Sequence, residues 1–188
     1  MARSDIHTII ISQQWYNRLL DHARRKLAGY YEKDEYEEQK AYGLMGARYE
    51  EEKAIIIGLY PLEKNIRHDE SYKNSMDASM HAHAHPSETP MEQRGWVTDP
   101  EEVWEASGQF TENGGEMFGS YHTHRVAWDH DPIRDTCTEI DRELAKGSGL
   151  WVFILSMVDP EQPRLRAFYE GDNEHEAEIS TLVQDHSE

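Results

Sequence analysis

The sequence predicts an α/β or α+β fold, in which a mixed β-sheet is flanked by helices. Segments whose apolar residues recur at helical spacing alternate along the chain with short segments rich in β-branched and aromatic residues. Such helices bury their apolar face by packing on the sheet. At 188 residues the chain is long enough for one sizeable core, and no internal repeat divides it. We therefore expect a single domain over residues 1–188.

The N-terminal part of the chain predicts one helix followed by two strands. Ser12 is a typical N-cap residue, and apolar residues recur at helical spacing from Trp15 to Leu27 before Gly29. Residues 41–47 and 53–60 have strand composition and are separated by a charged turn. Three consecutive isoleucines in the second strand indicate burial on both faces of the sheet.

The middle of the chain predicts a long loop or insertion, then a helix and a strand. Residues 63–95 are polar, with few large aliphatic side chains. Asp99-Pro100 is a helix-start signal for a short helix that ends near residue 110. The turn residues Asn113-Gly114-Gly115 then lead into a strand that includes residues 118–121.

The C-terminal part predicts a further helix and two strands. Asp131-Pro132 is a second helix-start signal, and an apolar stripe continues to residue 146. We therefore expect a helix over residues 132–146, followed by strands at 150–158 and 164–169. The tail from residue 173 is acidic, and we expect a marginal helix there.

Composition restricts the partners and the compartment of the protein. The net charge of −18, from 37 acidic and 19 basic residues, disfavours binding to nucleic acid or to anionic membranes. No segment approaches the roughly 18 apolar residues of a membrane span, and the first residues lack the order of a signal peptide. Cys137 is the single cysteine and falls on the apolar stripe, so we expect a core residue, no internal disulfide and a cytoplasmic protein.

The most informative motif is His122-Thr123-His124, with Asp135 after ten intervening residues. Alternate residues of a strand point to the same face, so both imidazoles are expected on one side. Asp135 would lie at the end of the first turn of the helix predicted to begin at Pro132. Two nitrogens and one oxygen, with a fourth position open for water, are the pattern of a catalytic zinc site.

The order of these elements resembles that of the JAMM (MPN-domain) zinc metalloproteases, in their prokaryotic single-domain form. The similar parts are Gly43-Leu44-Met45-Gly46, the segment 60–65, and residues 119–124 together with Asp135. The resemblance covers residues 9–169. It implies an MPN-domain architecture, which is cytidine-deaminase-like, with the insertion at about 63–95 and the acidic tail outside its common part.

The resemblance also implies a function. Family members hold one Zn²⁺ with a bound water, here through His122, His124 and Asp135. A glutamate acts as general acid and base, and the enzymes hydrolyse peptide or isopeptide bonds. Their substrates are often proteins that carry ubiquitin or a ubiquitin-like tail. We therefore predict a zinc-dependent metallopeptidase or isopeptidase with a protein or peptide substrate.

The catalytic glutamate has two candidates in this chain. The family glutamate stands seven residues before the glycine that corresponds to Gly46, and that position is Gln39. Glu38 is one residue away and Glu37 two, so a bulge at the start of the strand would bring either into place. We choose Glu38 as the acid and base.

A second departure concerns the oxyanion. The family has a serine three residues before the aspartate ligand, and this chain has Pro132 there. Removal of one oxyanion donor typically lowers the rate about a hundredfold or more. Ser120 is an alternative donor, and His130 is a candidate to contact the ligands or the substrate.

Two other functions stay open. One is a catalytically weak or inactive relative that works as a binding or assembly module. The other is a metal-binding protein that depends on the alternating tract of His81, His83 and His85, because histidine-rich tracts can bind metal. The identity of the substrate and the oligomeric state cannot be read from the sequence.

Overall fold

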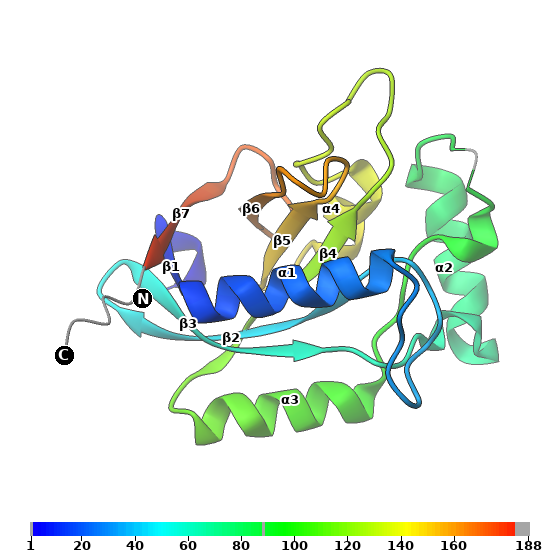
Figure 1. The fold of residues 1–188 in the computed structure, drawn as a ribbon. Helices are drawn as coiled ribbons and strands as arrows, with labels where there is room; N and C mark the ends of the chain where they lie inside the picture. The colour runs from blue at the N-terminus through cyan, green and yellow to red at the C-terminus, as the bar shows by residue number, and fades with distance from the viewer. Residues whose placement is uncertain (1, 88, 183–188) are drawn as a thin grey trace.

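Seven strands close into a β-barrel in this computed structural model, which describes residues 2–87 and 89–182 (Figure 1). The strands are β1 (Thr8–Ser12), β2 (Tyr42–Glu50), β3 (Lys53–Pro61), β4 (Glu116–His124), β5 (Trp151–Ser156), β6 (Arg164–Tyr169) and β7 (Glu176–Leu182). Their order around the barrel is β1-β3-β2-β4-β5-β6-β7, and β7 returns to β1. The pairs β1–β3, β1–β7 and β4–β5 are parallel, and the others are antiparallel.

The prediction of a mixed sheet flanked by helices, with an MPN-domain or cytidine-deaminase-like architecture, was wrong. The sheet closes because β1 and β7, which were both missed, pair in parallel from Thr8 and Glu178 to Ser12 and Leu182. β7 occupies the segment expected to be an acidic helix. Its apolar residues Ala177 and Ile179 alternate with polar ones, which is the period of a strand. The rest of that tail, residues 183–188, lies outside the described residues.

Four α-helices and three short 3₁₀ turns accompany the described strands. They are α1 (Gln13–Leu27), α2 (Glu70–His83), α3 (Pro100–Glu112) and α4 (Glu139–Ala145), with η1 (Arg3–Asp5), η2 (Ile66–His68) and η3 (Met91–Gln93). The helices expected after Ser12 and Asp99 are confirmed, as are the strands predicted in both halves. α2 was missed inside the segment predicted as a loop, because it buries only Met76 and Met80. In the described ranges no helix has the length and apolar character to cross a membrane.

Two helices pack on opposite sides of β2 and β3 (Figure 1). α1 places Leu19, Leu20 and Ala23 in the main core, together with residues of all seven strands that face the barrel interior. α3 packs Ala106 and Phe110 against the other side of β2. Gly46 permits this contact, because a Cβ atom there would lie 2.3 Å from the Phe110 ring. The packing fixes β2 beside β4, the strand that carries the two histidines.

Candidate metal centre

His122 and His124 lie at the C-terminal end of β4 and project from the same side of the strand. Their Nε2 atoms are 3.2 Å apart. β4 is held on both sides there, since His122 is paired with Tyr42 of β2 and with Ile154 of β5. His124 is almost completely buried, and His122 is partly buried. The predicted orientation of the two imidazoles is confirmed.

Asp141 of α4 completes the group. One carboxylate oxygen lies 3.2 Å from His122 Nε2, and the other lies 3.4 Å from His124 Nε2. Atoms bound about 2.0–2.1 Å from a tetrahedral zinc ion are separated from one another by about 3.3 Å. The three side chains therefore already have the spacing of three zinc ligands. In the described part of the chain they are the one group of three or more such residues close enough to hold a metal ion.

Asp135, the predicted third ligand, does not lie with the two histidines in the structure. Asp135 instead pairs with Arg166 at 3.2 Å and with Arg164 at 3.7 Å, on the outside of β6. The helix predicted from Pro132 does not form at its start, because Asp131 accepts a hydrogen bond from the Arg134 amide and Arg134 has a left-handed φ of 57°. The helix begins only at Glu139, after its N-cap Thr138, seven residues later than expected.

A capping signal for the later start is present in the sequence. Thr138 and Asp141 form a capping box, in which each side chain accepts a hydrogen bond from the backbone amide of the other residue. The Thr138 hydroxyl also donates to the same Asp141 oxygen at 2.7 Å. This motif orients Asp141 at the third position of the helix, where the carboxylate faces β4. The threonine three residues before an aspartate was the overlooked indication of the third member of this group.

The hydrogen bonds around the group favour a cation at its centre. His124 Nδ1 donates to the Arg134 carbonyl at 3.1 Å, which directs the Nε2 lone pair toward His122 and Asp141. Burial lowers the pKa of His124, although Asp141 opposes the shift. Burial alone would raise the pKa of Asp141, but the two histidines hold it well below its usual range. Three lone pairs that converge in this way are stabilised by a proton or a metal cation between them, and two imidazoles with one carboxylate are a donor set that zinc accepts, so the residues fit zinc.

The group opens into a cavity of about 430 Å³. Its walls combine apolar side chains, among them Leu44, Trp96 and Val152, with a few polar ones. The Trp96 ring stacks on Tyr42 at 5.0 Å and lies 6.5 Å from the His122 ring. Concave, mainly apolar sites with a few convergent polar groups are typical of small-molecule and substrate binding. Trp96 directly follows the segment 63–95 that was predicted as a loop. No sequence pattern indicated a functional role for it.

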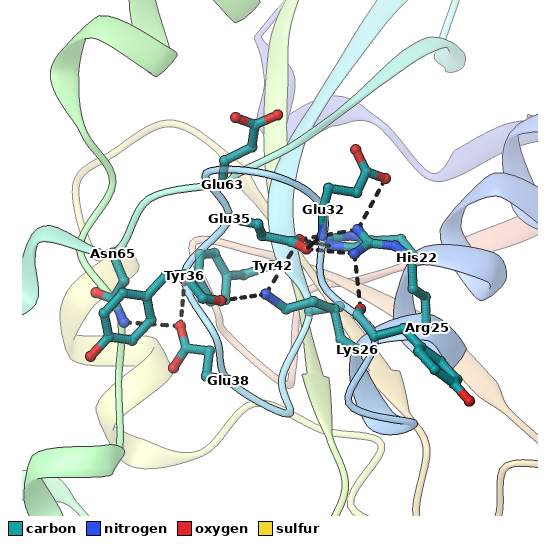
Figure 2. Close-up of polar contacts among 12 residues, drawn as sticks. His22, Arg25, Lys26, Glu32, Glu35, Tyr36, Glu38, Tyr42, Glu63 and Asn65 are labelled. Atoms are coloured by element: carbon teal, nitrogen blue, oxygen red, sulfur yellow. Dashed lines mark hydrogen bonds and ion pairs between the residues drawn. The ribbon is translucent and has the colours of Figure 1, made fainter.

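Glu38 lies just before β2 and contacts two residues that line this cavity, Tyr42 and Lys40. Its carboxylate accepts hydrogen bonds from the Tyr42 hydroxyl and from Asn65 Nδ2 (Figure 2). It also pairs with Lys40 at 2.8 Å. Tyr42 and Lys40 both line the cavity, and Tyr42 is the residue paired with His122. Glu38 is thus near the histidines but belongs to a separate hydrogen-bonded group. Glu37, the other candidate, is exposed.

The loop that carries Glu38 is anchored to α1 by buried charges. The Glu35 carboxylate contacts Arg25 and Lys26 of the helix, and Lys26 Nζ also donates to the Tyr36 carbonyl at 2.9 Å (Figure 2). His22 lies 3.6 Å from Glu35 through Nε2 and 2.8 Å from the Tyr121 hydroxyl through Nδ1. No sequence pattern indicated this cluster, because most of its residues lie in ordinary polar segments.

The remaining candidate residues fall in two places. Ser120 lines the cavity. His130 lies in a neighbouring hollow, where its ring is 4.2 Å from that of His85. In the histidine tract, His83 bonds Glu139 at 2.9 Å and His81 is exposed. The three tract histidines do not form a group of metal ligands in the described residues.

Comparison with known proteins supports the fold and adds nothing on activity. No protein-family model and no curated protein matches the chain. The solution structure of protein DSY2949 from Desulfitobacterium hafniense is similar over 95% of both chains, with 21% identity and a TM-score of 0.60. A solution structure of a protein from Salinibacter ruber aligns with 94% of this chain and 92% of its own, at 18% identity and a TM-score of 0.47. The first likeness shows that the fold recurs, and the second is too weak to argue from.

Proposed function

We propose that the protein is a zinc-dependent hydrolase of peptide or isopeptide bonds, with His122, His124 and Asp141 as the zinc ligands. The observation that carries this proposal is the triangle of ligand atoms, 3.2–3.4 Å on each edge, that opens into a cavity. Three protein ligands with a fourth position left for water or substrate are typical of catalytic zinc. A bound zinc ion would supply Lewis acidity and lower the pKa of water to about 7.

The position of Thr138 supports the similarity to the JAMM enzymes at the level of the site. Their serine stands three residues before the aspartate ligand, and Thr138 stands three residues before Asp141. The mismatch at Pro132 therefore disappears once the ligand is Asp141. The Thr138 hydroxyl lines the cavity beside that carboxylate. In the proposed reaction the single O–H group of Thr138 would turn from Asp141, which keeps the Thr138 amide as a donor, to the oxygen of the substrate amide as negative charge develops there.

Glu38 is the proposed general acid and base. It would take a proton from the attacking water and deliver it to the departing amine nitrogen. Its support is its place beside Tyr42, which is paired with His122 across β2 and β4.

A second function is favoured by a different observation. The Glu38 carboxylate already has three partners, Tyr42, Asn65 and Lys40. A carboxylate held in this way can be purely structural, and the protein would then be a metal-binding module that does not hydrolyse its ligand.

The metal ligands are tested by a matched pair of variants. We expect wild-type protein dialysed against zinc to retain one ion per chain by elemental analysis. Asp141→Asn should lose that ion, while Asp135→Asn should retain it, because Asp135 is bound to Arg166 outside the site. Zinc retained by Asp141→Asn, or lost from Asp135→Asn, would contradict the assignment.

The two functions are separated by replacing the glutamate. Zinc-loaded wild-type protein is incubated with ubiquitin-like fusions and a peptide library, and cleavage is followed by mass spectrometry. Under the hydrolase proposal, Glu38→Gln lowers the rate at least about a hundredfold with zinc content unchanged, and Glu37→Gln leaves the rate near that of the wild type. Cleavage by Glu38→Gln at the wild-type rate would remove Glu38 from the mechanism. No cleavage by the zinc-loaded wild type would favour the binding module.

A further inference from the structure

The cavity collects positive charge in a protein that is strongly acidic overall. Four basic residues line it: Lys40, Arg94, Arg125 and Arg134. Among the described lining residues Asp141 is the one carboxylate, and it belongs to the metal-ligand group. The chain as a whole has 37 acidic and 19 basic residues, so the positive charge of the cavity is opposite in sign to the net charge of the protein.

Arg134 is the most unusual of the four. It is only 7% exposed, and its Nε and Nη1 atoms are buried with no hydrogen-bond partner among the residues that the structure describes. The guanidinium carbon lies 3.2 Å from the centre of the Trp128 ring. Stacking on an aromatic face offsets part of the cost of burying the charge, but the N–H groups lie in the guanidinium plane and are not satisfied by it. A buried donor without an acceptor costs about 1–3 kcal/mol or more.

Arg94 adds a second guanidinium near the first. Both arginines line the same cavity. Burial lowers the pKa of Arg134, the carboxylates of Asp141 and Asp131 oppose this shift, and the charge of Arg94 adds a smaller decrease. Arg94 Nη2 donates to the His85 carbonyl at 2.8 Å. Lys40 differs, because Glu38 and the Gly95 carbonyl already satisfy it. The buried donors without a partner on the described cavity wall are therefore those of Arg134, and Arg94 adds positive charge to the same wall.

We propose that Arg134, with Arg94 beside it, binds the carboxylate of the ligand that occupies the cavity. The planar guanidinium offers parallel N–H donors that match the two oxygens of a carboxylate. The backbone of the same residue holds His124 through its carbonyl, so the carboxylate would bind next to the metal ligands. The apolar walls would hold a hydrophobic group of the same molecule.

The substrate class follows from this arrangement and in that respect rests on the proposed hydrolase function. It is an amide that carries a carboxylate and an apolar side chain close to the bond that is cleaved. A peptide with an apolar C-terminal residue and a free carboxyl group has this chemistry.

Equilibrium binding tests the subsite without any turnover. The probes are N-acetylphenylalanine and its neutral amide, titrated by calorimetry into chelator-treated protein so that no metal can bind the carboxylate. We expect the wild type to bind the carboxylate at least about tenfold more tightly than the amide. In Arg134→Gln this ratio should fall to about one with amide binding unchanged. Arg125→Gln, at an exposed position of the same cavity, should keep most of the preference.

Several outcomes would overturn the proposal. Equal binding of the two probes by the wild type would do so even if Arg134→Gln failed to fold, and so would a preference that survives in a folded Arg134→Gln protein. Inorganic phosphate that displaces the probe at equal concentration would overturn the assignment to a carboxylate. Because the measurement uses metal-free protein and no hydrolysis, its failure is distinct from loss of zinc binding or of activity.

Discussion

At the scale of single residues, the position of the candidate site depends on side chains whose partners are far away in the sequence. Glu35 is an example. Burial alone would raise its pKa, but hydrogen bonds from Arg25 and the Glu32 amide, together with the charge of Lys26, lower it to about 2. The carboxylate is thus ionised in the folded protein and holds the loop that contains Glu38.

We expect Glu35→Gln to lower the free energy of unfolding by about 3–5 kcal/mol, because it leaves the buried Lys26 without its counter-charge. The matched control is Glu32→Gln. Glu32 pairs with Arg25 at 3.5 Å but its side chain is 66% exposed, so the expected loss is about 0–1 kcal/mol. Urea denaturation monitored by fluorescence measures both. Equal effects of the two substitutions would show that Glu35 does not anchor the loop.

At the scale of elements, the start of α4 decides which aspartate joins the histidines. The capping box of Thr138 and Asp141 begins the helix, and the same hydrogen bonds orient the Asp141 carboxylate. Asp131-Pro132 has the composition of a helix start but forms a turn instead, with Arg134 in the left-handed region. Local composition favours both starts, and contacts with the rest of the protein select between them.

Loss of this cap should therefore affect metal binding as well as stability. We expect Thr138→Ala to lower the free energy of unfolding by about 1 kcal/mol and to weaken zinc binding about 10–100-fold, because the hydroxyl that caps the helix and donates to Asp141 is lost, while the backbone amide of residue 138 remains. Ser12→Ala removes the N-cap of α1, which contributes no residue to the candidate metal centre. This substitution should lower the free energy of unfolding by a similar amount and leave the zinc affinity unchanged. Competition with a chromogenic chelator gives the affinities. Equal zinc affinity in the two variants would contradict the role of the cap.

At the scale of the whole molecule, a buried histidine connects α1 to the barrel. Burial, assisted by the positive charge of Arg25, lowers the pKa of His22 to about 4, from an ordinary value of about 6.5. The folded protein thus binds fewer protons than the unfolded chain between these two values. Stability from this group is present above pH 6.5 and is lost as the pH falls toward 4.

The pH dependence can be isolated by one substitution. A shift of this size corresponds to about 3 kcal/mol, so His22→Gln should flatten the fall in stability between pH 6.5 and 4 by about that amount. The measurement is urea denaturation at a series of pH values in chelator, which removes any contribution of bound metal. A variant whose stability falls with pH as steeply as that of the wild type would contradict the assignment.

The sequence by itself determined most of the elements and two of the three residues of the candidate metal centre. Helix caps and the periodic spacing of apolar residues are local properties of the sequence. They therefore revealed the helix after Ser12, the strands from 41 to 60 and the pair His122 and His124. Local patterns also favoured Asp135, which the tertiary structure places with Arg166 instead.

Only the tertiary structure decided that the sheet closes and that Asp141 joins the two histidines. Barrel closure depends on the pairing of Thr8–Ser12 with Glu176–Leu182, segments at the two ends of the chain, and no local pattern specifies such a partner. The buried, unpartnered guanidinium of Arg134 is likewise a property of the packed protein. A local sequence pattern cannot indicate these contacts, because the residues that make them are far apart along the chain. The energies of the contacts also depend on which groups the fold removes from water together.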